Sequence, residues 1–321
     1  YTTDLAEIKG YDDMYNLTMK RTLAKKGLEE YEDAINILES DDAISFADSA
    51  DIKQLKFDLN WLAKKRAITF FYALDFATKF KPHHFAFAEW ANKLEDYTLA
   101  LRLNYAYRHW GINNTGVDGI QLEADVYKIL KNKREYVYLN YGIGINNYDI
   151  SVFPKHRLGV EYFFPIDKNI DGSVGGRYFL FSKDKVFILT GHIGTTNNKN
   201  WFAFRPYLTF SNSDETLFSF VANYRRYVKH NFDFFGVEFG YGVFPDDRLI
   251  LQPDGTSTLE LNSYKSYRIK LERNFLTKEL WEIRLGLGSI FEKIEKDEPT
   301  KIVDKSSPYR FLFEILFRYR L

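Results

Sequence analysis

The chain lacks several features that would place it in common protein classes. It has no cysteine, which excludes a disulfide framework and a thiolate metal site. It has no run of about 20 apolar residues, so the sequence predicts no membrane-spanning helix. Its formal net charge is zero, which argues against a nucleic-acid partner. The first residues contain no basic stretch followed by an apolar core, and we expect that any signal peptide has been removed.

From about Ala67 to the last residue, apolar and polar side chains alternate. In the clearest segment, Ile120 to Tyr127 (IQLEADVY), every second residue is aliphatic and the residues between them are polar or charged. Successive side chains of a strand point to opposite faces, so such a strand has one apolar and one polar face. The same alternation returns around residues 99–108, 157–162 and 202–210.

The length of these segments separates two all-β folds. A soluble β-sandwich also alternates, but its outer faces meet water and its strands are usually short. Many segments here run to about 11 to 15 residues, which suits a tilted crossing of the hydrocarbon layer. Aromatic residues make up 18% of the chain. The pattern therefore predicts an all-β transmembrane fold, an antiparallel outer-membrane β-barrel over residues 66–321.

The alternating segments predict fourteen strands, with twelve as the alternative because the second segment is weak. Bacterial barrels have even strand numbers, short periplasmic turns and longer outer loops. Connections after odd strands are the long ones here, as expected for a chain that enters from the periplasm. The predicted strands are 67–79, 84–92, 97–108, 116–129, 135–145, 155–165, 171–182, 185–196, 200–211, 215–228, 231–244, 258–274, 279–293 and 307–320.

Alternation assigns many charges of both signs to the lumen. They can line a conducting pore or form a network of arginine and carboxylate pairs that fills the interior. Bulky aromatics on the same face favour the network, and purely structural charges that fix strand register are the simpler interpretation. The predicted lumen charge network is Arg102, Arg108, Glu123, Asp125, Arg157, Glu161, Arg177, Arg205, Glu238, Arg268, Arg284 and Glu314, with Arg225, Lys270, Glu272 and Arg318 on the same face.

Residues 1–65 have a different period. Apolar residues recur there at spacings of three and four, which predicts amphipathic helices. The pattern faintly resembles one tetratricopeptide hairpin, and a single unit must cover its apolar faces with its own helices, the barrel rim or a partner. We therefore predict an α-helical periplasmic segment. The predicted partner-binding residues are Ile35, Leu38, Leu55, Leu59 and Leu62.

A catalytic or metal site is not expected. His83, His84 and His109, with Asp246 and Asp247, fall at predicted outer turns, so a histidine and carboxylate pair is sterically conceivable. Neighbouring residues of a strand point to opposite faces, which disfavours metal binding by both His83 and His84. We predict no catalytic residue, no metal and no cofactor.

An ordered series of residues over about 65–250 carries a family resemblance. It comprises Arg108, Gly111, Gly119, Gln121, Glu123, Asp125, Tyr127, Phe153, Pro154, Gly175, Arg177, Tyr178, Trp201, Arg205, Tyr207, Arg225, Arg226, Tyr227, Gly240, Gly242, Pro245 and Asp246. This series resembles the YaiO-like family of bacterial outer-membrane barrels, as does the helical lead-in. Lys128 departs from the expected proline, and Leu321 from the expected terminal aromatic. The resemblance implies an outer-membrane protein, sometimes met beside polysaccharide-handling genes, and transfers no catalytic residue.

Two function classes remain open. The first is a non-enzymatic barrel in the bacterial outer membrane that serves as a structural or accessory subunit of a cell-envelope complex. The second is a channel for transport or export, possibly of a saccharide. The expected partners are outer-membrane lipid, envelope proteins in the first case and a saccharide in the second, with no nucleic acid in either.

Overall fold

The chain forms two compact units in the computed structural model, Tyr1–Lys65 with Arg320–Leu321, and Arg66–Tyr319. Among the helices that the structure describes, none has the length and hydrophobicity needed to cross a membrane. The described residues are 11–27, 30–40, 48–77, 82–110, 115–130, 134–145, 152–181, 185–211, 216–228, 232–242, 250–251, 257–258, 266–277, 281–292 and 309–321.

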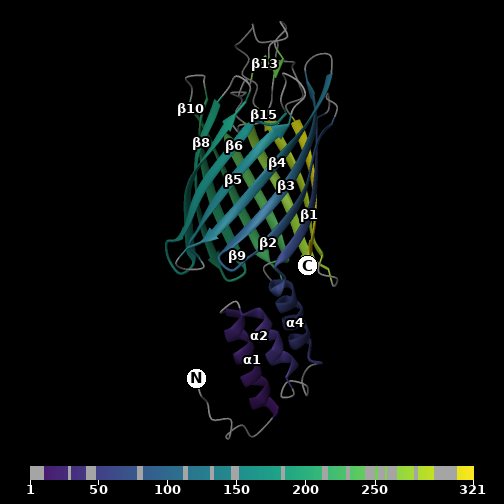
Figure 1. The fold of residues 1–321 in the computed structure, drawn as a ribbon, viewed down its shortest axis with the longest axis vertical. Coiled ribbons are helices and arrows are strands. Elements are labelled where there is room, and N and C mark those ends of the chain that lie inside the picture. Colours follow the sequence, from purple (N-terminus) through teal and green to yellow (C-terminus); the bar gives the residue numbers. More distant parts are fainter. Residues whose placement is uncertain are drawn as a thin grey trace. The chain divides into compact units, whose positions relative to one another are not determined.

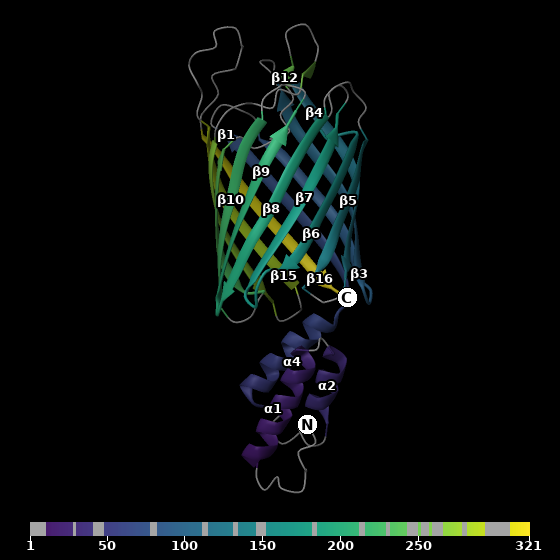
Figure 2. The ribbon, with the colours of Figure 1, turned by 90° about the vertical axis from the view of Figure 1, so that its left-hand side faces the viewer.

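The second unit is a closed barrel of fourteen antiparallel strands (Figures 1 and 2). Each strand pairs with the barrel strands that precede and follow it in sequence, and β1 lies beside β16 where the sheet closes. The strands are β1 (Arg66–Ala77), β2 (His83–Lys93), β3 (Tyr97–Trp110), β4 (Thr115–Ile129), β5 (Tyr136–Ile145), β6 (His156–Pro165), β7 (Ile170–Leu180), β8 (Lys185–Asn197), β9 (Asn200–Phe210), β10 (Thr216–Tyr227), β11 (Phe234–Gly242), β14 (Ser266–Leu276), β15 (Trp281–Glu292) and β16 (Tyr309–Arg320).

This architecture confirms the predicted barrel and its strand number. The weak second strand, β2, pairs with both β1 and β3 along nearly its whole length, which rules out the twelve-strand alternative. One predicted strand, 258–274, is too long. In the structure β14 begins at Ser266, while β13 (Ser257–Thr258) pairs with β12 (Ile250–Leu251) in a separate small sheet. Alternation marks extended chain, and it does not distinguish the barrel wall from a hairpin outside it.

Connections after even-numbered barrel strands are short, as predicted. The shortest joins β8 to β9 through Asn198 and Lys199, with Asn198 at φ 54°. Asparagine tolerates this left-handed conformation, which suits a two-residue hairpin. The connections after odd strands include the long ones, such as residues 146–155 between β5 and β6. The two ends of the barrel therefore differ in loop length.

The barrel distributes its side chains in the opposite way to a water-soluble domain. On β4, Leu122 points outward and is 53% exposed, whereas its neighbours Gln121 and Glu123 point inward and are buried. Large aliphatic and aromatic residues cover the outer face on every barrel strand. An apolar outer band and a polar interior are what a barrel in lipid requires.

The described residues of the first unit form the helices α1 (Tyr11–Gly27), α2 (Tyr31–Glu39) and α4 (Ala50–Ala63). The side chain of Ser49 accepts a hydrogen bond from the Ile52 backbone N–H at 3.3 Å and caps α4. Apolar side chains of α2 and α4 meet in a core, against which Met14, Tyr15 and Met19 of α1 pack. The buried members of this core are Ala34, Leu38, Ile52, Leu55 and Leu59.

The predicted partner-binding residues fall mostly in this core. Leu38, Leu55 and Leu59 are buried, Ile35 packs against them, and Leu62 is half-buried. The helices thus cover one another's apolar faces, which was one of the three arrangements considered. A partner would contact Leu38, Leu55 or Leu59 only if the helices separated, so the structure assigns these three residues an internal role instead.

Candidate functional site: the charged lumen

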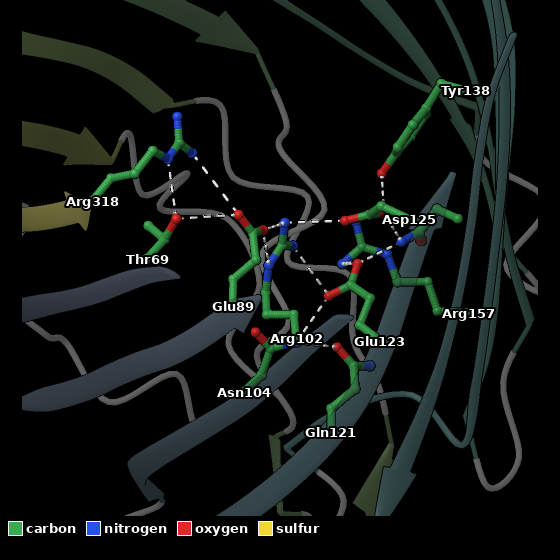
Figure 3. A network of polar contacts seen from close by, with 11 residues as sticks. Thr69, Glu89, Arg102, Asn104, Gln121, Glu123, Asp125, Tyr138, Arg157 and Arg318 are labelled. Atoms are coloured by element: carbon green, nitrogen blue, oxygen red, sulfur yellow. Dashed lines mark hydrogen bonds and ion pairs between the residues drawn. The ribbon is translucent and has the colours of Figure 1, made fainter. Parts of the chain in front are cut away.

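Arg102 of β3 is the centre of an ion-pair network on the inner wall (Figure 3). Its Nη2 atom lies 2.6 Å from Oε2 of Glu89 and 3.0 Å from Oδ2 of Asp125, and its Nη1 atom lies 3.4 Å from Oε2 of Glu123. Strand register explains this meeting, because Glu89 of β2 and Glu123 of β4 stand opposite Arg102 on its two sides. One guanidinium therefore joins three carboxylates.

Neutral donors complete the hydrogen bonding of these buried carboxylates. Glu123 accepts from Nδ2 of Asn104 at 2.8 Å and from Nδ2 of Asn140 at 2.6 Å. Asp125 accepts from the Tyr138 hydroxyl at 2.8 Å and from the same Asn140 amide. A buried carboxylate is tolerated only when it is paired and hydrogen-bonded, and here both conditions hold. Figure 3 shows the Tyr138 hydroxyl directed toward Asp125, with Asn104 beside Glu123.

The network continues across the closure between β1 and β16. Nε of Arg318 donates to the Thr69 hydroxyl at 3.0 Å, and Nη2 lies 3.9 Å from Oε1 of Glu89. Elsewhere on the same two strands, Arg310 pairs with Asp75, with Nε 3.1 Å from Oδ1. Side-chain pairs thus link the first and last barrel strands in addition to the backbone.

A second group surrounds Lys270 of β14. Its Nζ lies 3.1 Å from carboxylate oxygens of both Glu272 and Glu314, and 3.9 Å from Oε2 of Glu238. Arg268 pairs with Glu238 at 3.0 Å. Lys270 and Glu314 lie on β14 and β16, with β15 between them, so this pair extends over a full strand of the wall.

A third group lies on β6 to β9. Nη1 of Arg205 lies 2.6 Å from Oε1 of Glu161, which also accepts from the Ser173 hydroxyl at 2.5 Å. Four more inward arginines reach carboxylates at longer distances. These pairs are Arg157 with Glu123 at 3.5 Å, Arg225 with Glu272 at 3.8 Å, Arg284 with Glu282 at 3.6 Å and Arg318 with Glu282 at 3.5 Å.

Two members of the predicted network stand apart from these groups. Arg108 lies on the inward face of β3 opposite Val117. Arg177 lies on the inward face of β7 between Gly159 and Ile188, and no described carboxylate pairs with it. All the predicted lumen residues thus lie on the inner face, but they form separate groups rather than one network.

Several residues of the network were missed from the sequence. Glu89 and Asp75 lie on the two least regular segments, and Glu282 and Arg310 lie near strand ends, where alternation is short. Asn140 is uncharged, so the pattern of inward charges does not mark it. Strand register is the signal that finds three of them, since Glu89, Glu282 and Asn140 each stand opposite a predicted charge.

Apolar side chains occupy part of the lumen as well. Val152 and Phe153 precede β6 and pack against the inward side chains of Phe85, Ala106 and Val117. Val152 is fully buried, and the Phe85 and Phe153 rings lie 6.4 Å apart between centroids. The backbone N–H of Gly144 on β5 meets the Pro154 carbonyl at 3.1 Å. The connection between β5 and β6 therefore turns inward at this point, which no periodic signal indicated.

The residues considered for catalysis do not gather in the described part of the chain. His83 and His84 begin β2 and face opposite sides of the wall, and His84 Nδ1 lies 2.7 Å from the Tyr72 hydroxyl on the outer face. The side chain of His109, and Asp246 and Asp247, lie outside the described residues. Within the described residues, no group of three His, Asp or Glu side chains could hold a metal ion.

The family follows from a comparison with protein-family models. The model described as the YaiO membrane beta barrel domain matches residues 65–247, more than half of the chain. The chain belongs to the YaiO membrane β-barrel family. The match confirms the resemblance seen in the sequence. No curated protein matched this YaiO barrel.

Three solved structures illustrate what this YaiO barrel is similar to. A bacterial polysaccharide outer membrane secretin is 8% identical at TM-score 0.49, covering 80% of this chain and 99% of its own. Omp33 of Acinetobacter baumannii is 9% identical at TM-score 0.46, with 80% and 98% covered. The translocator domain of autotransporter NalP from Neisseria meningitidis is 13% identical at TM-score 0.44, with 86% and 98% covered.

Proposed function

We propose that this YaiO barrel is a non-enzymatic structural or accessory subunit of an outer-membrane complex, and that its lumen does not conduct. The observation that carries the proposal is the burial of small inward side chains. Ser219, Thr209 and Val221 point into the lumen, yet they are 0%, 1% and 5% exposed. Longer groups must cover them. A conducting pore would instead leave such wall residues in contact with water.

Two further features support a filled lumen. Val152 and Phe153 pack inside the barrel as an apolar cluster, and hydrophobic constrictions exclude water and ions. The ion-pair groups around Arg102 and Lys270 satisfy their charges with one another, so they need no ligand. In this proposal lipid covers the outer face, and envelope proteins contact the helical unit from the periplasm.

Conductance in a planar bilayer tests the closed lumen. The full-length protein is expected to give no steady current under voltage. A variant with Val152 and Phe153 both replaced by glycine controls for insertion, because it should remain in the membrane and give more leakage than the parent. A steady current through the unaltered protein that a saccharide blocks would overturn the proposal and support the transport function.

Partner association tests the accessory role. Removal of residues 1–60 should leave a folded barrel, because every barrel strand begins after that point. Co-purifying envelope proteins should then be lost in mild detergent. On α1 the exposed Leu23 is a sharper probe, with Leu23→Gln expected to weaken association and Lys20→Gln, also exposed, to leave it unchanged. An unchanged set of proteins after truncation would contradict the accessory role.

Labelling of cysteines tests the proposed orientation. Lys168 lies in the short connection between β6 and β7, and Lys155 in the long one between β5 and β6. Both are exposed. If short turns are periplasmic, an impermeant thiol reagent on intact cells should label Lys155→Cys and spare Lys168→Cys until the outer membrane is opened. The reverse pattern would place the helical unit outside the cell.

A further inference from the structure

One stretch of the inner wall carries more arginine than carboxylate. Arg157 of β6, Arg177 of β7, Arg205 of β9 and Arg225 of β10 all face inward. Three of them reach a described carboxylate, and Arg177 does not. This part of the lumen therefore differs from the balanced groups around Arg102 and Lys270.

Among the described residues, none places a carboxylate against the Arg177 guanidinium. Gly159 and Ile188 stand opposite it on the two neighbouring strands, and Ile188 is buried. The stem of Arg177 lies against Gly159, where a Cβ would come within 3.8 Å of its Cγ. Arginine stays charged at any physiological pH and carries five donors. A half-buried arginine with no carboxylate partner in the described part of the chain has those donors to offer to an anion.

Tyr207 of β9 brings a second donor to the same part of the lumen. Ile188 of β8, which stands opposite Arg177 on one side, lies diagonal to Tyr207 on the other. The Tyr207 ring packs against Phe181, Val186 and Ile188, which fixes the position of the side chain. Arg205 and Arg268 each have their own carboxylate, Glu161 at 2.6 Å and Glu238 at 3.0 Å. Arg177 is therefore the arginine of this group that has no carboxylate partner among the described residues.

We propose that Arg177 and Tyr207 bind an oxyanion in the lumen, either the carboxylate of an acidic sugar or a phosphate group. A guanidinium fits both groups with two parallel hydrogen bonds, and the tyrosine hydroxyl donates a third. A neutral sugar offers no charge to this site. The site does not depend on conduction or on the accessory role, since it needs only access from one end of the barrel.

Titration calorimetry of the full-length protein in detergent tests the site. The probes are a galacturonic acid trisaccharide, the neutral trisaccharide maltotriose, and inorganic phosphate. At least one anion is expected to bind, more weakly as salt is raised, and maltotriose is expected to give no heat. Whichever anion binds identifies the source of the oxyanion, an acidic sugar or free phosphate.

Matched variants test whether the anion binds at Arg177 and Tyr207. Arg177→Gln should weaken it about tenfold or more, because a charge-assisted pair is lost. Tyr207→Phe keeps the packed ring and should weaken it a few fold. Arg177→Lys retains the charge but loses the planar pair of parallel donors, so its affinity for the anion should lie between those of the parent and Arg177→Gln. Arg226→Gln, which alters an exposed arginine on the outer face of β10, should bind as the parent does.

Three results would overturn the proposal. The first is that no anion binds to the parent protein. The second is that Arg177→Gln binds as tightly as the parent, and the third is that Arg226→Gln weakens binding as much as Arg177→Gln, which would mean surface attraction only. If Arg177→Gln does not fold, Tyr207→Phe and Arg177→Lys test the site in its place. The proposal would be wrong if both of these variants bound the anion as tightly as the parent protein. A conducting but anion-binding barrel would defeat the closed-lumen proposal and leave this one standing.

Discussion

The two units of this chain bury opposite kinds of residue. In the helical unit Leu59 is fully buried, whereas in the barrel Leu287 is 62% exposed and Glu123 is 5% exposed. Leucine is therefore an interior residue in the helical unit and an outer-surface residue in the barrel. The difference shows that the surrounding medium, water or lipid, decides which side chains are buried. Water drives leucine into a core, but lipid accepts leucine and leaves the lumen to polar side chains.

The two interiors also depend on different interactions. The helical core is held by apolar contacts, which are non-directional and tolerate some change of shape. The barrel interior is held by charged hydrogen bonds, where removal of one partner leaves another buried without compensation. Substitutions at matched positions should therefore have unlike consequences in the two units.

The largest loss of stability is expected for a substitution inside the barrel. Glu123→Leu removes the acceptor that Arg102, Asn104 and Asn140 share and takes from Arg157 the carboxylate that it reaches. It should lower the free energy of unfolding by about 3 to 5 kcal/mol. Leu122→Val, next to it on the outer face, serves as the control and should change little. Urea unfolding in lipid vesicles measures both. Unchanged stability together with altered conductance would make Glu123 a pore residue instead.

A smaller loss is expected in the helical unit. Leu59→Ala removes a fully buried side chain and should destabilise the three helices by about 2 to 5 kcal/mol, with about 3 as the central expectation. Hydrogen exchange should speed up in α2 and α4 and stay unchanged in the barrel strands. Leu271→Ala, on the outer face of β14, should leave both units protected. Faster exchange throughout the barrel would show that the two units are not independent.

A charged residue on the outer face of the barrel should lower the free energy of unfolding by slightly less. Leu287→Arg places a charge where lipid is expected, with a cost of about 2 to 4 kcal/mol at the middle of the bilayer and less near its surfaces. Urea unfolding in vesicles measures the loss, and Leu287→Phe should be nearly neutral there. If arginine is tolerated as well as phenylalanine, this part of β15 faces a protein or water rather than lipid.

The smallest effect concerns an exposed pair at the start of α4. The hydrogen bond from Lys53, 2.9 Å away, and then its charge lower the pKa of Asp48. The pair therefore adds stability above the ordinary pKa of 3.8, and this contribution disappears as the pH falls through the lowered value. Lys53→Met should return the pKa of Asp48 to the ordinary range in an NMR titration. A pKa that stays low in this variant would assign the shift to another group.

The sequence predicted the barrel well because its signal is local. Alternation in residues 120–127 places Glu123 inward without any knowledge of neighbouring strands. The partners of Glu123 could not be predicted, because they depend on register between strands. The inward turn at Val152 and Phe153 could not be predicted either, since a loop has no period. In the helices, the apolar stripes were correct, but periodicity does not say what covers a stripe.

The side-chain links between β1 and β16 join positions far apart in the sequence. Asp75 and Arg310 are separated by 235 residues, and Thr69 and Arg318 by 249. A chain that stops short of β16 would leave Asp75 and Thr69 without these donors and β1 with an open edge. Synthesis must therefore be complete before the first strand has its full set of bonds. Because β1 and β16 must pair to close the sheet, only a chain that has been synthesised to its last strand forms a stable barrel.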